Sequence, residues 1–185
     1  MKILKKVIPV VLLVLLIAGC GKQADTPADL MNSMNMNATS NSEDFSLGKY
    51  NNISQATLQE LEQAKIATAK YHDINKAFAD GYVDINVFIH HMGFHFLKSA
   101  ILDSTFEVDK PELLVYTPNP GNGNMQLVAL EYAVPLSLSQ NAPEGFTGDS
   151  DVWQVNDQFQ LWTLHAWVWY FNPDGVFSPM NSRVP

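Results

Sequence analysis

The stretch FQLWTLHAWVWYFNPDGVF, residues Phe159–Phe177, decides the fold that the sequence predicts. Between Leu161 and Phe171 the only titratable side chain other than tyrosine is His165. If the segment is a strand, successive side chains point to opposite faces, and the residues on both faces are mainly apolar. This pattern predicts a strand in the middle of a sheet that is covered on both faces. The segment Asn172-Pro173-Asp174-Gly175 ends that strand, because Pro removes a ladder donor and Asp-Gly favours a tight turn. A histidine in so apolar a strand is the first sign of a functional site.

Two further strands and one helix complete the predicted core. Pro111–Tyr116 and Met125–Val134 flank a turn rich in Pro, Gly and Asn, and this pattern predicts a hairpin. Val83–His91 alternates and also favours a strand, whereas the polar residues 135–158 predict a loop. Ser54–Asp80 has apolar residues at steps of three and four, which indicates one long helix. The predicted fold class is therefore α+β, with a long N-terminal helix packed on an antiparallel sheet in a single domain.

The N-terminus has the features of a lipoprotein signal peptide. Lys2, Lys5 and Lys6 precede the apolar run Val7–Ile17, and Ile17-Ala18-Gly19-Cys20 resembles the lipobox of bacterial lipoproteins. That resemblance implies cleavage after residue 19, acylation of Cys20 and a lipid-anchored location in the cell envelope. An ordinary signal peptide or a membrane helix are the alternatives, but the run is short for a membrane span.

Composition divides the rest of the chain and limits its partners. Residues 20–48 are rich in Asn, Ser, Asp and Thr without periodicity, which predicts a disordered tether before a globular domain at 49–185.

Loss of residues 1–19 removes three lysines and no acid, so the formal charge falls from −8 to −11 with His neutral. Such an acidic chain disfavours nucleic acid as a partner. Cys20 is the only cysteine, which excludes disulfides and thiolate chemistry in the domain.

Glu131 is a second anomaly, because it shares a face of its predicted strand with Leu127, Ala129 and Ala133. Glutamate is rarely buried without a partner. With His95 and His165 it would form a set of two imidazoles and one carboxylate, which suits zinc, copper or another divalent transition metal. His90 and His91 are possible accessory ligands, since His91 and His95 would share one face if the backbone were helical there.

Each candidate ligand also has a purely structural interpretation. Arg183 is the only arginine in the chain, and a buried pair between Glu131 and Arg183 would explain the glutamate without any metal. A histidine in an apolar strand is often a core residue bonded to a carbonyl or carboxylate, and this interpretation remains open for His95 and His165. Exposure beside the sheet is the simpler interpretation of His90 and His91.

Five short motifs follow one another in a fixed order along the domain. From about Ala67 to its end the chain resembles a family of secreted bacterial proteins of uncharacterised function. The resemblance gives weight to His95, Glu131 and His165, which fall on motif positions, and none to His90 or His91. It implies no known activity, and the cysteine pair of that family is absent here. The motifs are Met92-Gly93-Phe94-His95, Pro111–Tyr116 (Pro-Glu-x-Leu-x-Tyr), Leu127–Pro135 (Leu-Val-x-x-Glu-Tyr-x-Val-Pro), Leu164–Trp169 (Leu-His-x-Trp-x-Trp) and Asn172–Phe177 (Asn-Pro-x-Gly-x-Phe).

Three functions are compatible with these features. The first is an envelope lipoprotein that binds a divalent transition metal or a small ligand through the His/Glu site. The second is a structural or partner-binding lipoprotein in which the histidines and the glutamate are core polar groups. A metal-assisted hydrolase is third, and the sequence leans away from an enzyme because it contains no serine nucleophile motif, phosphate loop or acid pair.

Overall fold

The computed structural model describes residues 46–185. The predicted signal peptide, the lipobox with Cys20 and nearly all of the predicted tether lie outside these residues. The described chain begins with the 3-10 turn η1 (Leu47–Lys49), and the side chain of Leu47 is fully buried in the main hydrophobic core. The last residues assigned to the tether therefore contribute to packing.

The helical region is divided into short pieces, so the predicted long N-terminal helix is wrong. It consists of α2 (Gln55–Thr68), the 3-10 turn η2 (Ala69–His72) and α3 (Ile74–Ala79). The division falls at Asp73, which has extended backbone angles and whose carboxylate accepts a hydrogen bond from the backbone N–H of Asn75. An Asp side chain that caps a new helix competes with continuation of the preceding one. The apolar periodicity crosses this break and so conceals it.

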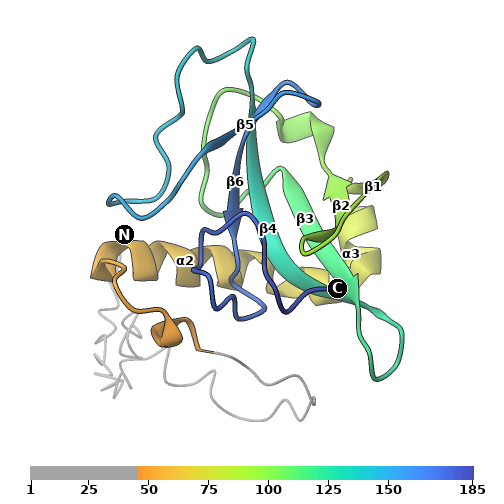
Figure 1. Ribbon diagram of the computed structural model, residues 1–185. Helices are drawn as coiled ribbons and strands as arrows, with labels where there is room; N and C mark the ends of the chain where they lie inside the picture. The colour runs from red at the N-terminus through yellow and green to blue at the C-terminus, as the bar shows by residue number, and fades with distance from the viewer. Residues whose placement is uncertain (1–45) are drawn as a thin grey trace, which may run out of the picture. The chain divides into compact units, whose positions relative to one another are not determined.

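The architecture is a curled six-stranded antiparallel sheet with one substantial helix, α2 (Figure 1). The strand order is β1-β2-β3-β4-β6-β5, and every neighbouring pair is antiparallel. Register shifts in the β1–β2 and β3–β4 pairs mark bulges, which bend strands and increase twist. The strands are β1 (Val83–Ile89), β2 (Gly93–Leu97), β3 (Leu113–Pro118), β4 (Met125–Pro135), β5 (Gln154–Asn156) and β6 (Leu161–Ala166), and a 3-10 turn, η3 (Ser99–Ile101), follows β2.

Strand β6 is shorter than the apolar run that predicted it. It ends at Ala166, and the backbone N–H of Trp167 donates instead to the carbonyl of Val176 in the following loop. Apolar content continues to Phe171 because this loop is also packed against the core. Strand β5 lies inside the region predicted to be a loop.

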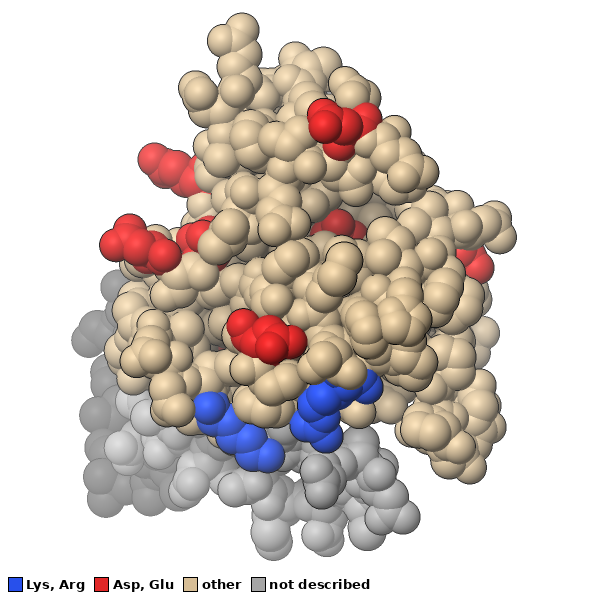
Figure 2. Space-filling view, viewed as in Figure 1, with Lys and Arg blue, Asp and Glu red and all other residues tan. Residues whose placement is uncertain are grey.

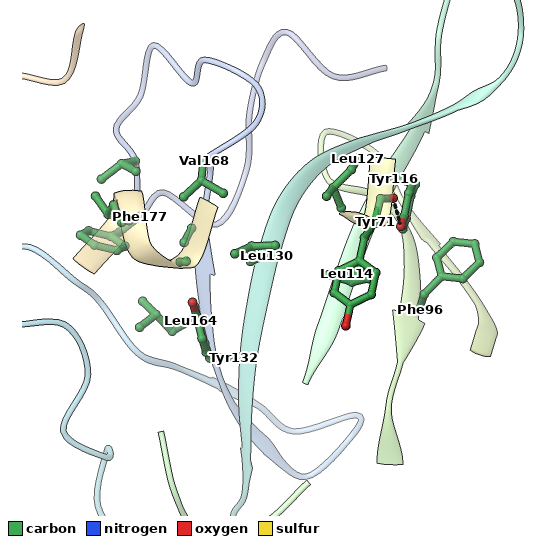
Figure 3. Packing of buried hydrophobic residues seen from close by; sticks show 14 of the residues in the cluster. Tyr71, Phe96, Leu114, Tyr116, Leu127, Leu130, Tyr132, Leu164, Val168 and Phe177 are labelled. Atoms are coloured by element: carbon green, nitrogen blue, oxygen red, sulfur yellow. Dashed lines mark hydrogen bonds between the residues drawn. The ribbon is translucent and has the colours of Figure 1, made fainter. Parts of the chain in front are cut away.

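The two faces of the sheet have different roles, and we call them the packed face and the cavity face. The packed face contacts the helical segments and contains Leu114, Tyr116, Leu130, Tyr132 and Leu164, all fully buried in one hydrophobic cluster (Figure 3). The hydroxyl of Tyr116 donates to the carbonyl of Tyr71 at 2.7 Å, which joins β3 to η2 (Figure 3). The cavity face contains Leu113, Glu131, Thr163 and His165 and lines a pocket.

On the face seen in Figure 2, acidic side chains are scattered, and the basic ones gather near the lower edge. Within residues 46–185, no helix combines the length and apolar content that crossing a bilayer requires.

Candidate metal site

Three strands supply the three predicted ligands to one point on the cavity face. His95 lies in β2, Glu131 in β4 and His165 in β6. Glu131 and His165 are direct partners in the β4–β6 register, so their side chains leave the sheet side by side on one face. Strand β3 separates β2 from β4, and the side chains of His95 and Glu131 meet above it.

The distances bring all three side-chain tips together. The Nε2 atom of His95 lies 3.5 Å from Oε2 of Glu131, and the Nε2 atom of His165 lies 3.7 Å from Oε1. One ligand atom from each residue falls within 4.8 Å of the others. Zinc sits about 2.0–2.2 Å from nitrogen and oxygen ligands, which places tetrahedral ligands about 3.3 Å apart. Small side-chain movements would therefore bring both pairs to the spacing of a shared ion.

Burial controls the charge of each group. It raises the pKa of Glu131 from 4.5 to about 8 and lowers the pKa of His165 from 6.5 to about 3. The nearby His95 also lowers the pKa of His165. The pKa of His95 falls as well, because desolvation outweighs its contacts with backbone groups of Val87 and Gly93. Both imidazoles are thus held in the neutral form that binds metals.

Backbone contacts orient His95 for ligation. Its Nδ1 atom lies 3.2 Å from the carbonyl oxygen of Val87 in β1, so Nδ1–H donates and the lone pair of Nε2 faces Glu131. Gly93 makes this close approach of strands possible. It has φ +121°, and a Cβ there would lie 2.4 Å from the carbonyl oxygen of Tyr116. The Met-Gly-x-His motif therefore has a direct structural explanation.

The ring of His165, unlike that of His95, has a nitrogen that no neighbouring group orients. Its Nε2 atom is buried and has no hydrogen-bond partner in the described structure. An orphaned buried nitrogen costs about 1–3 kcal/mol, so native proteins usually satisfy such groups. A metal ion bound between Nε2 and the Glu131 carboxylate would satisfy this nitrogen. The group His95, Glu131 and His165 can hold a metal ion, and the donor set suits zinc or copper.

The other candidate residues lie elsewhere. His91 adopts φ 64° in the β1–β2 turn, and its Nδ1–H donates to the carbonyl of Val184 in the C-terminal tail. The ring of His90 contacts that of His91, and neither residue lines the cavity. The helical geometry that would have aligned His91 with His95 is absent, because β2 begins at Gly93.

The interpretation of Glu131 as a partner of Arg183 is also wrong. The guanidinium of Arg183 lies over the ring of Tyr170, with 5.2 Å from Cζ to the ring centre. Within the described chain, the ion pairs of Glu131 are those with His95 and His165. A permanently charged lysine or arginine therefore does not explain why Glu131 is buried.

A cavity of about 390 Å³ lies over the three ligands. Its walls include residues of β1 and of the segment around β5, neither of which the sequence analysis connected to the site. The alternation that predicted this strand includes Ile85, Val87 and Ile89, and all three side chains line the cavity. The segment 154–159 gave no signal, because Gln154, Asn156 and Asp157 are typical of a solvated loop.

Comparison of the chain with protein-family models, with curated proteins and with solved structures finds no match. The class of site is therefore defined by its geometry alone: two neutral imidazoles and one carboxylate at the floor of a cavity.

Proposed function

We propose that this protein is a lipid-anchored protein of the cell envelope that binds a divalent transition metal through His95, Glu131 and His165. One observation carries the proposal. Within the described residues, the buried Nε2 of His165 has no hydrogen-bond partner and lies 3.7 Å from the buried carboxyl group of Glu131. A purely structural core would leave this nitrogen unsatisfied.

Lipid anchoring is supported by the sequence alone. The basic start, the apolar run and the lipobox ending in Cys20 occur in the order that lipoprotein processing requires. Labelling with a palmitate analogue checks this part: Cys20→Ala should remove the label. A variant that is labelled as strongly as the wild type would show that Cys20 is not the acylated residue.

Zinc titration of thermal unfolding tests the metal site. A metal that binds only the folded chain adds about 2.7 kcal/mol to the free energy of unfolding at 100 times its Kd. We expect Zn²⁺ to raise the Tm of the wild type. Glu131→Gln and His165→Ala should lower the affinity at least 100-fold, because loss of a supporting residue outside the ligand set already costs about 10–100-fold.

Two variants provide matched controls. Glu112 is the other buried glutamate of the described residues, but its carboxylate accepts a hydrogen bond from the backbone N–H of Ala133 and does not line the cavity. Glu112→Gln should leave zinc affinity unchanged. His91→Ala should do the same, since His91 contacts the C-terminal tail. A wild-type Tm that does not respond to Zn²⁺, Cu²⁺ or Co²⁺ would refute the metal site and favour the structural interpretation.

Zinc binding should also release protons. At pH 7 most of the Glu131 carboxyl is protonated, because burial raises its pKa to about 8, and ligation requires the ionised form. Calorimetry in two buffers with different ionisation enthalpies measures this release, which should approach one proton per ion at pH 7 and vanish in Glu131→Gln.

A further inference from the structure

The cavity over the metal site has a predominantly apolar wall. Strand β1 supplies Ile85, Val87 and Ile89, and the lining also includes Leu97, Leu102 and Leu113. A volume of about 390 Å³ lies in the range of small-molecule sites, roughly 300–1,000 Å³. Such a space is much larger than a metal-bound water or hydroxide needs. The wall therefore indicates an organic ligand with an apolar body.

The polar side chains that line the cavity differ in their exposure to solvent. His95, Glu131 and His165 are buried. Gln154, Asn156 and Asp157 belong to the segment around β5, where they are more exposed. Among residues 46–185, no lysine or arginine lines the cavity. An anionic ligand thus finds no cation among the lining side chains, and a metal ion at the three ligands would be the only positive charge available to it.

Charge balance then selects the head group of the ligand. A divalent ion bound by two neutral imidazoles and one carboxylate retains one net positive charge. An uncompensated charge beside apolar walls is strongly disfavoured, whereas one monoanionic donor makes the centre neutral. Asp157 also lines the cavity, but it belongs to the exposed segment around β5 and not to the three buried ligands. Three protein ligands also leave a fourth tetrahedral position for that donor.

The exposed part of the cavity lining contains apolar side chains as well as these polar ones. Val155 and Phe159 line it and remain 48% and 39% exposed. Exposed apolar side chains at a cavity mouth extend the surface on which an apolar ligand can be buried. Both residues lie in or next to β5, the short edge strand of the sheet.

We propose that the ligand is an amphipathic monoanion, such as a medium-chain carboxylate, whose head coordinates the metal and whose apolar body occupies the cavity. This inference rests on the proposed metal site. It differs from the hydrolase interpretation, in which the fourth position would be occupied by water or hydroxide and the chain would act on a bond.

Isothermal titration of the purified full chain with decanoate, decanol and acetate tests the proposal, with and without saturating Zn²⁺. We expect decanoate to bind the zinc form at least 10-fold more tightly than either of the other probes. Decanol has the apolar body without the charge, and acetate has the charge without the body. Without zinc, decanoate should bind at least 10-fold more weakly.

A pair of variants on β1 locates the ligand. Ile85→Trp places a large ring in the cavity, whereas Val83→Trp alters an exposed residue that does not line it. Both should keep the zinc affinity of the wild type, because neither residue lies among the three ligands. Only Ile85→Trp should weaken decanoate, by at least 10-fold.

The outcomes separate this inference from the metal proposal. If zinc binds but decanoate binds no better than acetate, the ligand class is wrong and the metal site stands. Equal binding of decanoate with and without zinc would show that the head does not coordinate the metal, and it would also overturn the inference. Absence of zinc binding refutes the metal site itself.

Discussion

Leu164 and His165 are neighbours in β6, yet they belong to two different environments. Leu164 is fully buried on the packed face, within a continuous cluster of aliphatic and aromatic side chains. His165 is almost as deeply buried on the cavity face, where its Nε2 atom has no hydrogen-bond partner. One strand thus contributes to stability through one face and, by our proposal, to binding through the other.

The two buried glutamates show the same difference. Glu112 accepts a hydrogen bond of 2.9 Å from the backbone N–H of Ala133, so its carboxylate has a structural partner. Glu131 faces two imidazoles at 3.5 and 3.7 Å, distances too long for good hydrogen bonds. Burial alone therefore does not mark a functional carboxylate. What distinguishes Glu131 is its position beside the two buried imidazoles of His95 and His165.

The largest expected effect on stability is on the packed face. Leu164→Ala should lower the free energy of unfolding by about 2–5 kcal/mol, because it removes buried methyl groups and leaves a cavity. Chemical denaturation without metal measures this loss. Zinc affinity should change less than threefold, since Leu164 points away from the ligands. A large loss of affinity would show that the two faces are not independent.

Substitution of the neighbouring His165 should raise the free energy of unfolding instead of lowering it. His165→Leu replaces an unsatisfied buried nitrogen with an apolar group of similar size, so it should stabilise the metal-free protein by about 1–3 kcal/mol. The same denaturation experiment measures the gain, and zinc should no longer raise the Tm. Destabilisation of the metal-free form would instead assign His165 a structural role in the core.

The site could be predicted from the sequence to the extent that local anomalies reveal it. His165 and Glu131 stand out because each interrupts an otherwise apolar strand, and adjacent antiparallel strands readily place such residues side by side. His95 depended on the motif position after Gly93. The cavity could not be predicted, because it depends on how strongly the sheet curls and on the path of residues 154–159, neither of which has a local sequence signal.

The helix was mispredicted for a physical reason. Apolar residues at steps of three and four continue from α2 through α3, since both segments cover the packed face. Asp73 breaks the backbone between them by capping α3, and this local choice does not disturb the period. Periodicity therefore identified the buried face of α2 but not the continuity of the helix. It also placed Phe78 on the buried face of α3, where Ala77 is buried instead and Phe78 is 47% exposed.

Stability as a function of pH compares the same two carboxyls in the metal-free protein. Burial raises the pKa of both Glu112 and Glu131 from 4.5 to about 8. Burial also lowers the pKa of His95 and His165 below 6.5, so these histidines add stability as pH rises, but only up to about 6.5. Above that pH both histidines are neutral in the folded and unfolded chains. Above pH 6.5 the two glutamates therefore dominate the pH dependence of the free energy of unfolding.

Between pH 6.5 and 8 the metal-free protein should lose stability as pH rises. The folded chain keeps protons on the two buried carboxyls that the unfolded chain has already released, so folding binds protons and higher pH opposes it. Each carboxyl contributes a slope of up to about 1.4 kcal/mol per pH unit. Denaturation at several pH values should show this slope, and Glu112→Gln should reduce it by about half. Saturating zinc should remove the contribution of Glu131, because the bound ion holds that carboxylate ionised in the folded state. Zinc combined with Glu112→Gln should therefore give a profile that no longer falls over this range, and a slope that persists would mean that other groups titrate there.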